Sequence, residues 1–216
     1  MSEVAGEGVF SHSPDGPVVL VAQVGAAMGS QAAAAALACA GSEPDSAALL
    51  VDLGNGRAPR STLVATAGAR ALEERLVAHL PNAAVASRGQ ICQLKLPPCP
   101  EGVAAIAAAL PLVRESAAVI HLTPNLLRLV LDEPRIGPTS ALLRADLKKD
   151  RALTALAARS LMAGGLRVAV LRCPPGWLAA RAALLGALSA SGQALPDRLC
   201  RRLLATGSQR ARCRRP

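Results

Sequence analysis

The chain has 216 residues and a formal net charge of +9, from 24 Lys and Arg residues against 15 Asp and Glu residues. A chain of this length can bury a sizeable core, and we expect a single domain. Apolar residues make up 51% of the sequence, with one Phe, one Trp and no Tyr. The core must therefore be packed from Ala, Leu and Val, and a nucleic-acid platform of stacked aromatic side chains is disfavoured.

The first elements expected along the chain are a strand, a glycine turn, a helix and a second strand. These elements are expected at 18–22, 23–31, 32–40 and 47–52. Ser30 or Gln31 falls in the first turn of the helix, and the second strand ends at Asp52. This order is typical of the opening βαβ unit of a nucleotide-binding α/β fold.

The rest of the chain alternates short apolar runs with helical segments. Further strands are expected at 89–96, 117–122, 140–145 and 166–171. Further helices are expected at 69–80, 101–114, 125–131, 151–163, 177–188 and 197–204, with Asn125 and Asp150 as caps. Such alternation predicts an α/β three-layer sandwich, P-loop NTPase-like or Rossmann-like, in which a mostly parallel sheet is covered by helices on both faces.

The two ends of the chain differ from this middle part. We expect a disordered lead at 1–16, one α/β domain at 17–204 and a basic, disordered tail at 205–216. No signal sequence and no apolar run of roughly 18 residues is found, so a cytoplasmic protein without a transmembrane segment is expected. The spacing of the six cysteines fits no metal or disulfide pattern, which favours buried free thiols.

Arginines gather near the C-terminus. They are Arg198, Arg201, Arg202, Arg210, Arg212, Arg214 and Arg215. Such a cluster fits a contact for DNA, an acidic partner or anionic lipid, and it equally fits a solubilising tail. Trp177 heads an expected helix, where it serves as a packing anchor or marks a partner site.

The glycine turn has the shape but not the charges of a phosphate site. Gly25 and Gly29 suit a turn that presents helix N–H groups to phosphate. The P-loop pattern G-x-x-x-x-G-K-[ST] also requires a lysine and a hydroxyl, and here Ser30 and Gln31 occupy those positions. Losing both removes most of the electrostatic stabilisation on which phosphoryl transfer depends.

The order of elements resembles that of the MinD/ParA-like group of SIMIBI-class P-loop ATPases, which includes septum-placement and partition proteins. The run 49–52, Leu-Leu-Val-Asp, matches that family's second strand, and Gly29 stands at the last loop glycine. Alanines replace the first two glycines, and the signature lysine is missing at 24–25. The run 118–124 resembles the Walker B strand with His121 in place of its Asp. The resemblance implies the fold and a vestigial nucleotide site at Gly25, Gly29, Ser30, Gln31 and Asp52.

Two other interpretations of the turn stay open. Residues 25–31 also resemble the turn of short-chain dehydrogenases, with Asp52 as the acid on the ribose. The catalytic motif of that family is Y-x-x-x-K, and this chain contains no tyrosine. A dehydrogenase is therefore disfavoured, and a non-catalytic dinucleotide sensor remains as the alternative. The turn can also be purely structural. His121 is expected to be a hydrogen-bonded interior residue, with a base or metal ligand as the alternative.

The sequence thus favours a pseudo-ATPase without catalytic or metal residues and without a required cofactor, although ATP or another nucleotide can still bind. The expected role is a non-hydrolysing scaffold or regulatory adaptor that associates with itself, a related ATPase or another protein. The assembly implied by the resemblance is one for division, DNA repair or partition. The alternatives are a nucleotide-binding enzyme with an altered loop, and a DNA-associated accessory protein that uses the C-terminal arginines.

Overall fold

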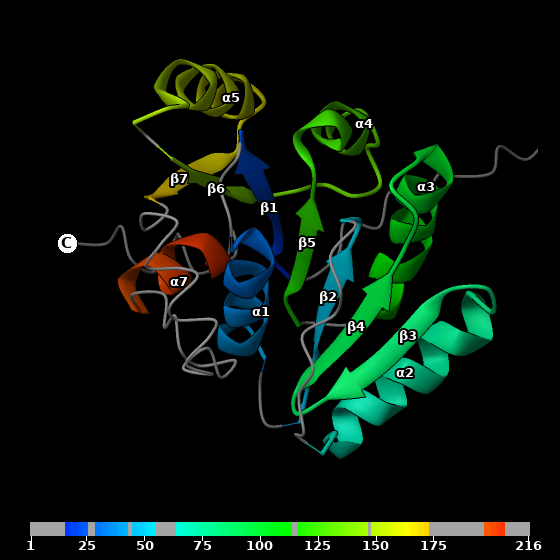
Figure 1. Cartoon of the computed structure of the whole chain (residues 1–216). Helices are drawn as coiled ribbons and strands as arrows, with labels where there is room; N and C mark the ends of the chain where they lie inside the picture. Colours follow the sequence, from blue (N-terminus) through cyan, green and yellow to red (C-terminus); the bar gives the residue numbers. More distant parts are fainter. Residues whose placement is uncertain are drawn as a thin grey trace, which may run out of the picture.

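A computed structural model shows an α/β protein built on one seven-stranded sheet (Figure 1). It describes residues 16–25, 29–42, 45–54, 64–113, 116–146, 148–172 and 197–205. The strands are β1 (Val18–Val24), β2 (Ala48–Asp52), β3 (Ala84–Arg88), β4 (Ile91–Lys95), β5 (Ala118–Leu122), β6 (Ser140–Ala145) and β7 (Arg167–Arg172). The helices are α1 (Ser30–Ala40), α2 (Ala67–His79), α3 (Pro100–Ala109), α4 (Leu127–Leu131), α5 (Arg151–Ala163) and α7 (Asp197–Leu204), with short 3-10 turns at Leu110–Leu112 and Pro124–Leu126.

The strand order across the sheet is β3-β4-β2-β5-β1-β6-β7. All neighbouring pairs are parallel except β3 with β4. The first strand of the chain, β1, therefore lies near the centre, hydrogen-bonded to β5 on one side and β6 on the other.

Helices cover both faces of the sheet (Figure 1). Along β1, Leu20 and Ala22 pack toward α2, α3, α4 and α5, whereas Val19 and Val21 pack toward α1 and α7. This alternation follows from the two-residue period of a strand, and it explains why the strands are continuous apolar runs. The expected three-layer α/β architecture with a mostly parallel sheet is confirmed.

Several expected elements have different boundaries. The strand expected at 89–96 is β4, and it is the second strand of a hairpin in which β3 and β4 pair antiparallel around Gly89 at φ 54°. The strand β3 was missed because it lies at the sheet edge, is only partly buried and carries little apolar pattern. Helix α1 begins at Ser30 rather than at residue 32.

The expected caps are also corrected. Asn125 lies inside a 3-10 turn that precedes α4, so it does not cap that helix. Asp150 stands at the N-cap position of α5, but its side chain makes no capping hydrogen bond. Pro124 begins this 3-10 turn, which explains the first difference, because proline favours a first turn rather than a helix interior.

The cysteines follow the prediction in part. Cys92 is fully buried in β4, and burial raises the pKa of its thiol to about 11, so this thiol stays protonated and inert at neutral pH. Cys39 is exposed on α1, which contradicts the expectation of a buried thiol at this position. Among the described helices, none has the length and apolar content needed to cross a lipid bilayer.

Shortening Leu37 on α1 tests the packing of this layer. Leu37 is fully buried against the sheet, so Leu37→Ala should lower the free energy of unfolding by about 2–5 kcal/mol through lost contacts and a cavity. The matched control is Leu156→Ala on α5, where the side chain is 64% exposed and the change should stay within about 0.5 kcal/mol. Denaturant unfolding measures both, and equal losses in the two variants would contradict the layer assignment.

Candidate functional site

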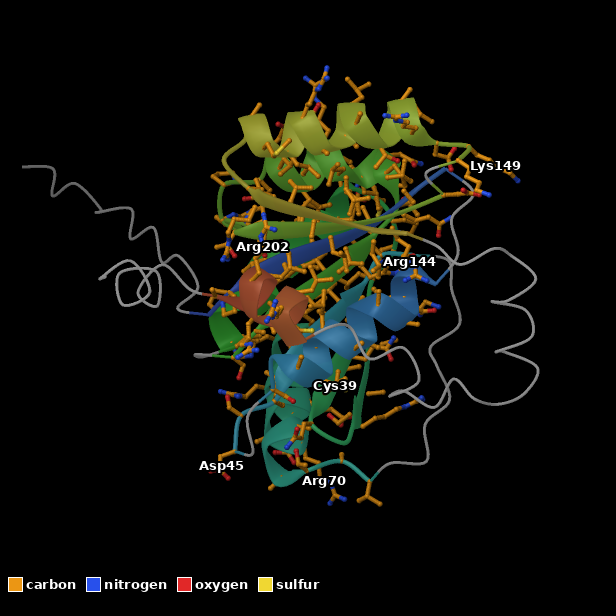
Figure 2. The ribbon with its side chains drawn as sticks, turned by 90° about the vertical axis from the view of Figure 1, so that its left-hand side faces the viewer. Cys39, Asp45, Arg70, Arg144, Lys149 and Arg202 are labelled. Carbon is orange, nitrogen blue, oxygen red and sulfur yellow. The ribbon has the colours of Figure 1, made fainter. Side chains whose placement is uncertain are left out.

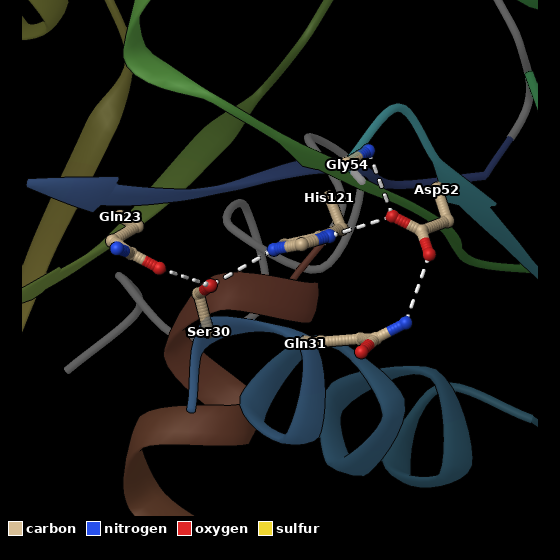
Figure 3. Close-up of polar contacts among 6 residues, drawn as sticks. All are labelled: Gln23, Ser30, Gln31, Asp52, Gly54 and His121. Atoms are coloured by element: carbon tan, nitrogen blue, oxygen red, sulfur yellow. Dashed lines mark hydrogen bonds and ion pairs between the residues drawn. The ribbon is translucent and has the colours of Figure 1, made fainter. Parts of the chain in front are cut away.

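Five polar side chains meet where the central strands end (Figure 3). We call Gln23, Ser30, Gln31, Asp52 and His121 the polar cluster. They come from β1, the first turn of α1, the end of β2 and β5. The carboxyl ends of parallel strands are where open α/β sheets place their ligand sites, so this is the position at which a functional site is expected.

Strand register brings the two ionisable members together. In the parallel pair β2 and β5, Asp52 lies directly beside His121, and both face α1. Their neighbours Val51 and Ile120 point to the opposite face and belong to the apolar core there. A one-residue slip of either strand would separate the pair, because it would move one side chain to the other face.

Hydrogen bonds connect the cluster from end to end. The Oγ of Ser30 is 2.9 Å from Nε2 of His121, and Nδ1 of His121 is 2.8 Å from Oδ1 of Asp52. The Nε2 of Gln31 donates to Oδ2 of Asp52 at 2.8 Å, and the backbone N–H of Gly54 donates to Oδ1 at 2.9 Å. The Oγ of Ser30 also donates to Oε1 of Gln23 at 3.3 Å.

Donor and acceptor counting assigns the protons. Gln31 and Gly54 donate to Asp52 and Nδ1 of His121 contacts it, an arrangement that suits a carboxylate because a carboxylate only accepts. Nδ1 of His121 then carries a proton and donates it to Asp52, and in the neutral imidazole Nε2 accepts from Ser30. Asp52 is fully buried and Ser30 and His121 are less than a tenth exposed, so these bonds offset the cost of burying polar groups.

The glycine turn beside the cluster is left-handed at both of its described glycines. Gly25 has φ 62° and Gly29 has φ 85°, which side chains with a Cβ rarely adopt. A Cβ on Gly25 would overlap the carboxylate of Asp150, and a Cβ on Gly29 would lie 3.2 Å from Nη2 of Arg144. The turn thus lies between a carboxylate and a guanidinium.

The residues predicted as a vestigial nucleotide site do come together. Gly25 and Gly29 border the turn, Ser30 and Gln31 open α1, and Asp52 closes β2. Their polar atoms, however, bond to one another and to His121. The expectation that His121 is a hydrogen-bonded interior residue is confirmed.

The arginines lie elsewhere. Arg198, Arg201 and Arg202 are exposed on α7, which packs beside α1 on the same face of the sheet (Figure 2). Trp177 and the remaining tail arginines lie outside the described residues. They are Arg210, Arg212, Arg214 and Arg215.

Helix α7 is held by its C-terminal carbonyl groups. The guanidinium of Arg167 donates to the backbone oxygens of Arg202 at 2.7 Å, Leu203 at 3.2 Å and Ala205 at 2.6 Å. The Oγ of Ser140 donates to the oxygen of Leu203 at 2.6 Å. A cation at the C-terminus of a helix satisfies unpaired carbonyls and the helix dipole, so these bonds fix α7 on β6 and β7.

Sequence reasoning missed Gln23 and Arg144. Gln23 is the one polar residue of β1, and Arg144 is 3% exposed in β6, directly beside Gln23 in the register. Each stands alone in an apolar run, and that isolation is the signal that marks a buried polar role. Which neighbours satisfy such a residue depends on strand order, which the run itself does not contain.

Other sites of chemistry are not apparent in the described part of the chain. No group of three or more His, Cys, Asp or Glu side chains there could hold a metal ion. Two shallow surface hollows lie along α2, and their lining residues do not overlap with the polar cluster. The chain matches no protein-family model and no curated protein, so the family expectation depends on the order of elements and on the turn.

Replacing His121 tests how much the polar cluster stabilises the fold. In His121→Ala the buried carboxylate of Asp52 loses a donor and the hydroxyl of Ser30 loses a partner, so stability should fall by about 3–5 kcal/mol. His79→Ala is the matched control, because His79 is exposed on α2 and contacts a carbonyl of its own helix. Thermal and denaturant unfolding measure both, and a His121 variant as stable as the control would rule out this role.

Proposed function

We propose that this protein is a non-hydrolysing, MinD/ParA-like scaffold or regulatory adaptor of the cytoplasm that acts through association with proteins. Its partner is a second copy, a related ATPase or another member of a division, DNA-repair or partition assembly. The observation that carries the proposal is the polar cluster. Its side chains stand where phosphoryl transfer needs a lysine and magnesium ligands, and they bond to one another.

Three features of the cluster argue against nucleotide hydrolysis. Ser30, at the position of the P-loop lysine, carries no charge, and its hydroxyl contacts His121. The carboxylate of Asp52, an oxygen ligand that magnesium would need, already accepts from three donors. Beside the cluster, the carboxylate of Asp150 at Gly25 offsets the attraction that the guanidinium of Arg144 at Gly29 would exert on a phosphate in the turn.

Exposed apolar side chains support association. Among the residues that the structure describes, seven large apolar side chains are exposed, and four of them lie on α5 and the adjacent strand β7, at Leu153, Leu156, Met162 and Val170. Their exposed fractions run from 41% to 64%. Apolar side chains grouped on one surface mark protein contacts more often than scattered ones do. Leu153 and Leu156 are three residues apart and share one side of α5, so that side is the expected contact with a partner.

Nucleotide binding is tested by thermal unfolding of the full chain with ATP, ADP and NAD, with and without magnesium, alongside an ATP turnover assay. A ligand at about 100 times its Kd would stabilise the fold by about 2.7 kcal/mol and raise Tm by roughly 5–10 °C. We expect no shift that requires magnesium and no turnover. Magnesium-dependent turnover that disappears in Asp52→Ala would refute the pseudo-ATPase proposal, and a shift with NAD would favour the dinucleotide alternative.

Association is tested by sedimentation of the full chain over a range of concentrations. We expect a self-association that ATP does not change and that weakens about tenfold or more in the double variant Leu153→Ser, Leu156→Ser, because apolar contact area is lost. The control is Val64→Ser, Val77→Ser, which removes two exposed apolar side chains at and before α2. A chain that stays monomeric, or equal effects of the two pairs, would exclude this surface as a self-contact.

A second candidate function is DNA contact through α7. Arg198, Arg201 and Arg202 project from a helix whose C-terminus is fixed by Arg167 and Ser140. A fixed helix loses less side-chain and backbone freedom on binding than a free tail does. The excess of positive charge in the whole chain favours a polyanion as the partner.

The salt dependence of binding to duplex DNA tests this second candidate. Replacing Arg198, Arg201 and Arg202 by Ala should weaken binding and reduce the slope of log K against log salt by about 3, roughly one unit per phosphate contact. The control replaces three exposed arginines on α2 and α4, Arg70, Arg75 and Arg128, so the net charge changes equally. If both triple variants lose the same affinity for DNA, net charge alone explains the loss, and a specific contact through α7 is contradicted.

A further inference from the structure

Three members of the polar cluster, Ser30, His121 and Asp52, have the spatial arrangement of a serine-hydrolase triad. The Oγ of Ser30 contacts Nε2 of His121 at 2.9 Å, and Nδ1 of the same ring contacts Oδ1 of Asp52 at 2.8 Å. In such a site one ring nitrogen of the general base faces the nucleophile and takes its proton. The other ring nitrogen bonds to the acid that orients the base. The chain order Ser, Asp, His is also the order found in α/β-hydrolases.

The local backbone adds the second requirement. Ser30 is the first residue of α1, directly after the left-handed Gly29, in a strand-turn-helix unit that starts from β1. The N–H groups of the first helical turn have no intrahelical acceptors, and no described side chain caps this helix. The N–H groups of Gln31 and Ala32 thus follow the nucleophile at a helix N-terminus, where an oxyanion would be stabilised.

The side chains around the three residues limit their motion. Gln31 and the N–H of Gly54 hold the carboxylate of Asp52, and a carboxylate beside Nδ1 favours the tautomer of His121 that has its proton on Nδ1. The hydroxyl of Ser30 then has two acceptors within reach, Oε1 of Gln23 at 3.3 Å and Nε2 of His121 at 2.9 Å, and the contact with His121 is the shorter one. The hydroxyl is therefore directed at the base.

We propose that Ser30 is an acyl-accepting nucleophile, activated by His121 and Asp52, for uncharged esters of small carboxylic acids. In the first step Oγ of Ser30 bonds to the carbonyl carbon and its proton moves to Nε2 of His121. The bond from that carbon to the alcohol oxygen then breaks, and the alcohol leaves with the proton from Nε2. Water attacks the resulting ester of Ser30, transfers its proton through Nε2 back to Oγ, and releases the carboxylic acid.

The choice of a small acyl group follows from burial. Ser30 is 4% exposed and His121 is 7% exposed, so a long acyl chain has little surface through which to reach Oγ. This activity goes beyond the proposed association with proteins and does not depend on it, because it involves neither a nucleotide nor the surface of α5.

The experiment treats the full chain with p-nitrophenyl acetate and with the octanoate ester, and locates the acyl group by peptide mass spectrometry. We expect an acetyl group on Ser30, a much slower reaction with octanoate, no adduct at this position in Ser30→Ala, and acetylation slowed about 100-fold or more in His121→Gln. Ser42→Ala is the control, because the half-buried Ser42 lies beyond the end of α1, where its hydroxyl contacts Cys39 and Gln90 and not the polar cluster, so the rate should stay unchanged.

Circular dichroism establishes that each variant is folded before its rate is compared. Should His121→Gln fail to fold, the pH dependence of acetylation in the unmodified chain decides, since a rate controlled by the imidazole rises as the ring loses its proton and then levels off. Absence of acetyl from Ser30, an unchanged rate in a folded His121→Gln, or a rate that rises with hydroxide concentration without a plateau would each overturn the proposal.

Discussion

The contact between Asp52 and His121 is the constraint on which the centre of this structure depends. A fully buried carboxylate is costly unless its oxygens are bonded, and here His121, Gln31 and Gly54 donate to it. Those donors come from β5, from α1 and from the chain just after β2. One satisfied charge therefore connects two strands of the sheet to the helix that covers them.

This contact exists because β5 lies between β1 and β2. The parallel register sets Asp52 beside His121, and β1 on the other side of β5 brings the turn into α1 next to them. The same position carries nucleotides in P-loop and dinucleotide-binding proteins, because helix N-termini and strand ends converge there. In this chain the position is filled by mutually bonded neutral and acidic side chains, which is compatible with a scaffold, and their order also suits an activated serine.

The surfaces divide according to the layers of the sandwich. Helix α1 contains no charged residue and packs its alanines closely on the sheet, whereas its neighbour α7 presents arginines. On the opposite face, α5 exposes leucines. An apolar surface suits a protein partner and a cationic surface suits a polyanion, so the two faces of the sheet present surfaces for different kinds of partner.

The amino-acid pattern alone determined the class of fold and most of its elements. Apolar runs such as 18–22 and 166–171, separated by helical segments, predicted a buried parallel sheet because buried strands need no polar alternation. The same pattern placed Ser30, Gln31 and Asp52 near the turn and identified His121 as an interior residue. The sequence pattern did not predict the edge strand β3, because a partly exposed strand has a weak apolar pattern.

Tertiary structure decided what those polar residues do. Strand order and register decide that Asp52 bonds to His121 and that Gln23 lies beside Arg144. The first pair is separated by 69 positions in the chain, and the second pair by 121 positions. Local sequence contains the preference of each segment for helix or strand, but not the partner that each strand will pair with. Hydrogen bonds across strands therefore become visible only when the whole sheet is assembled.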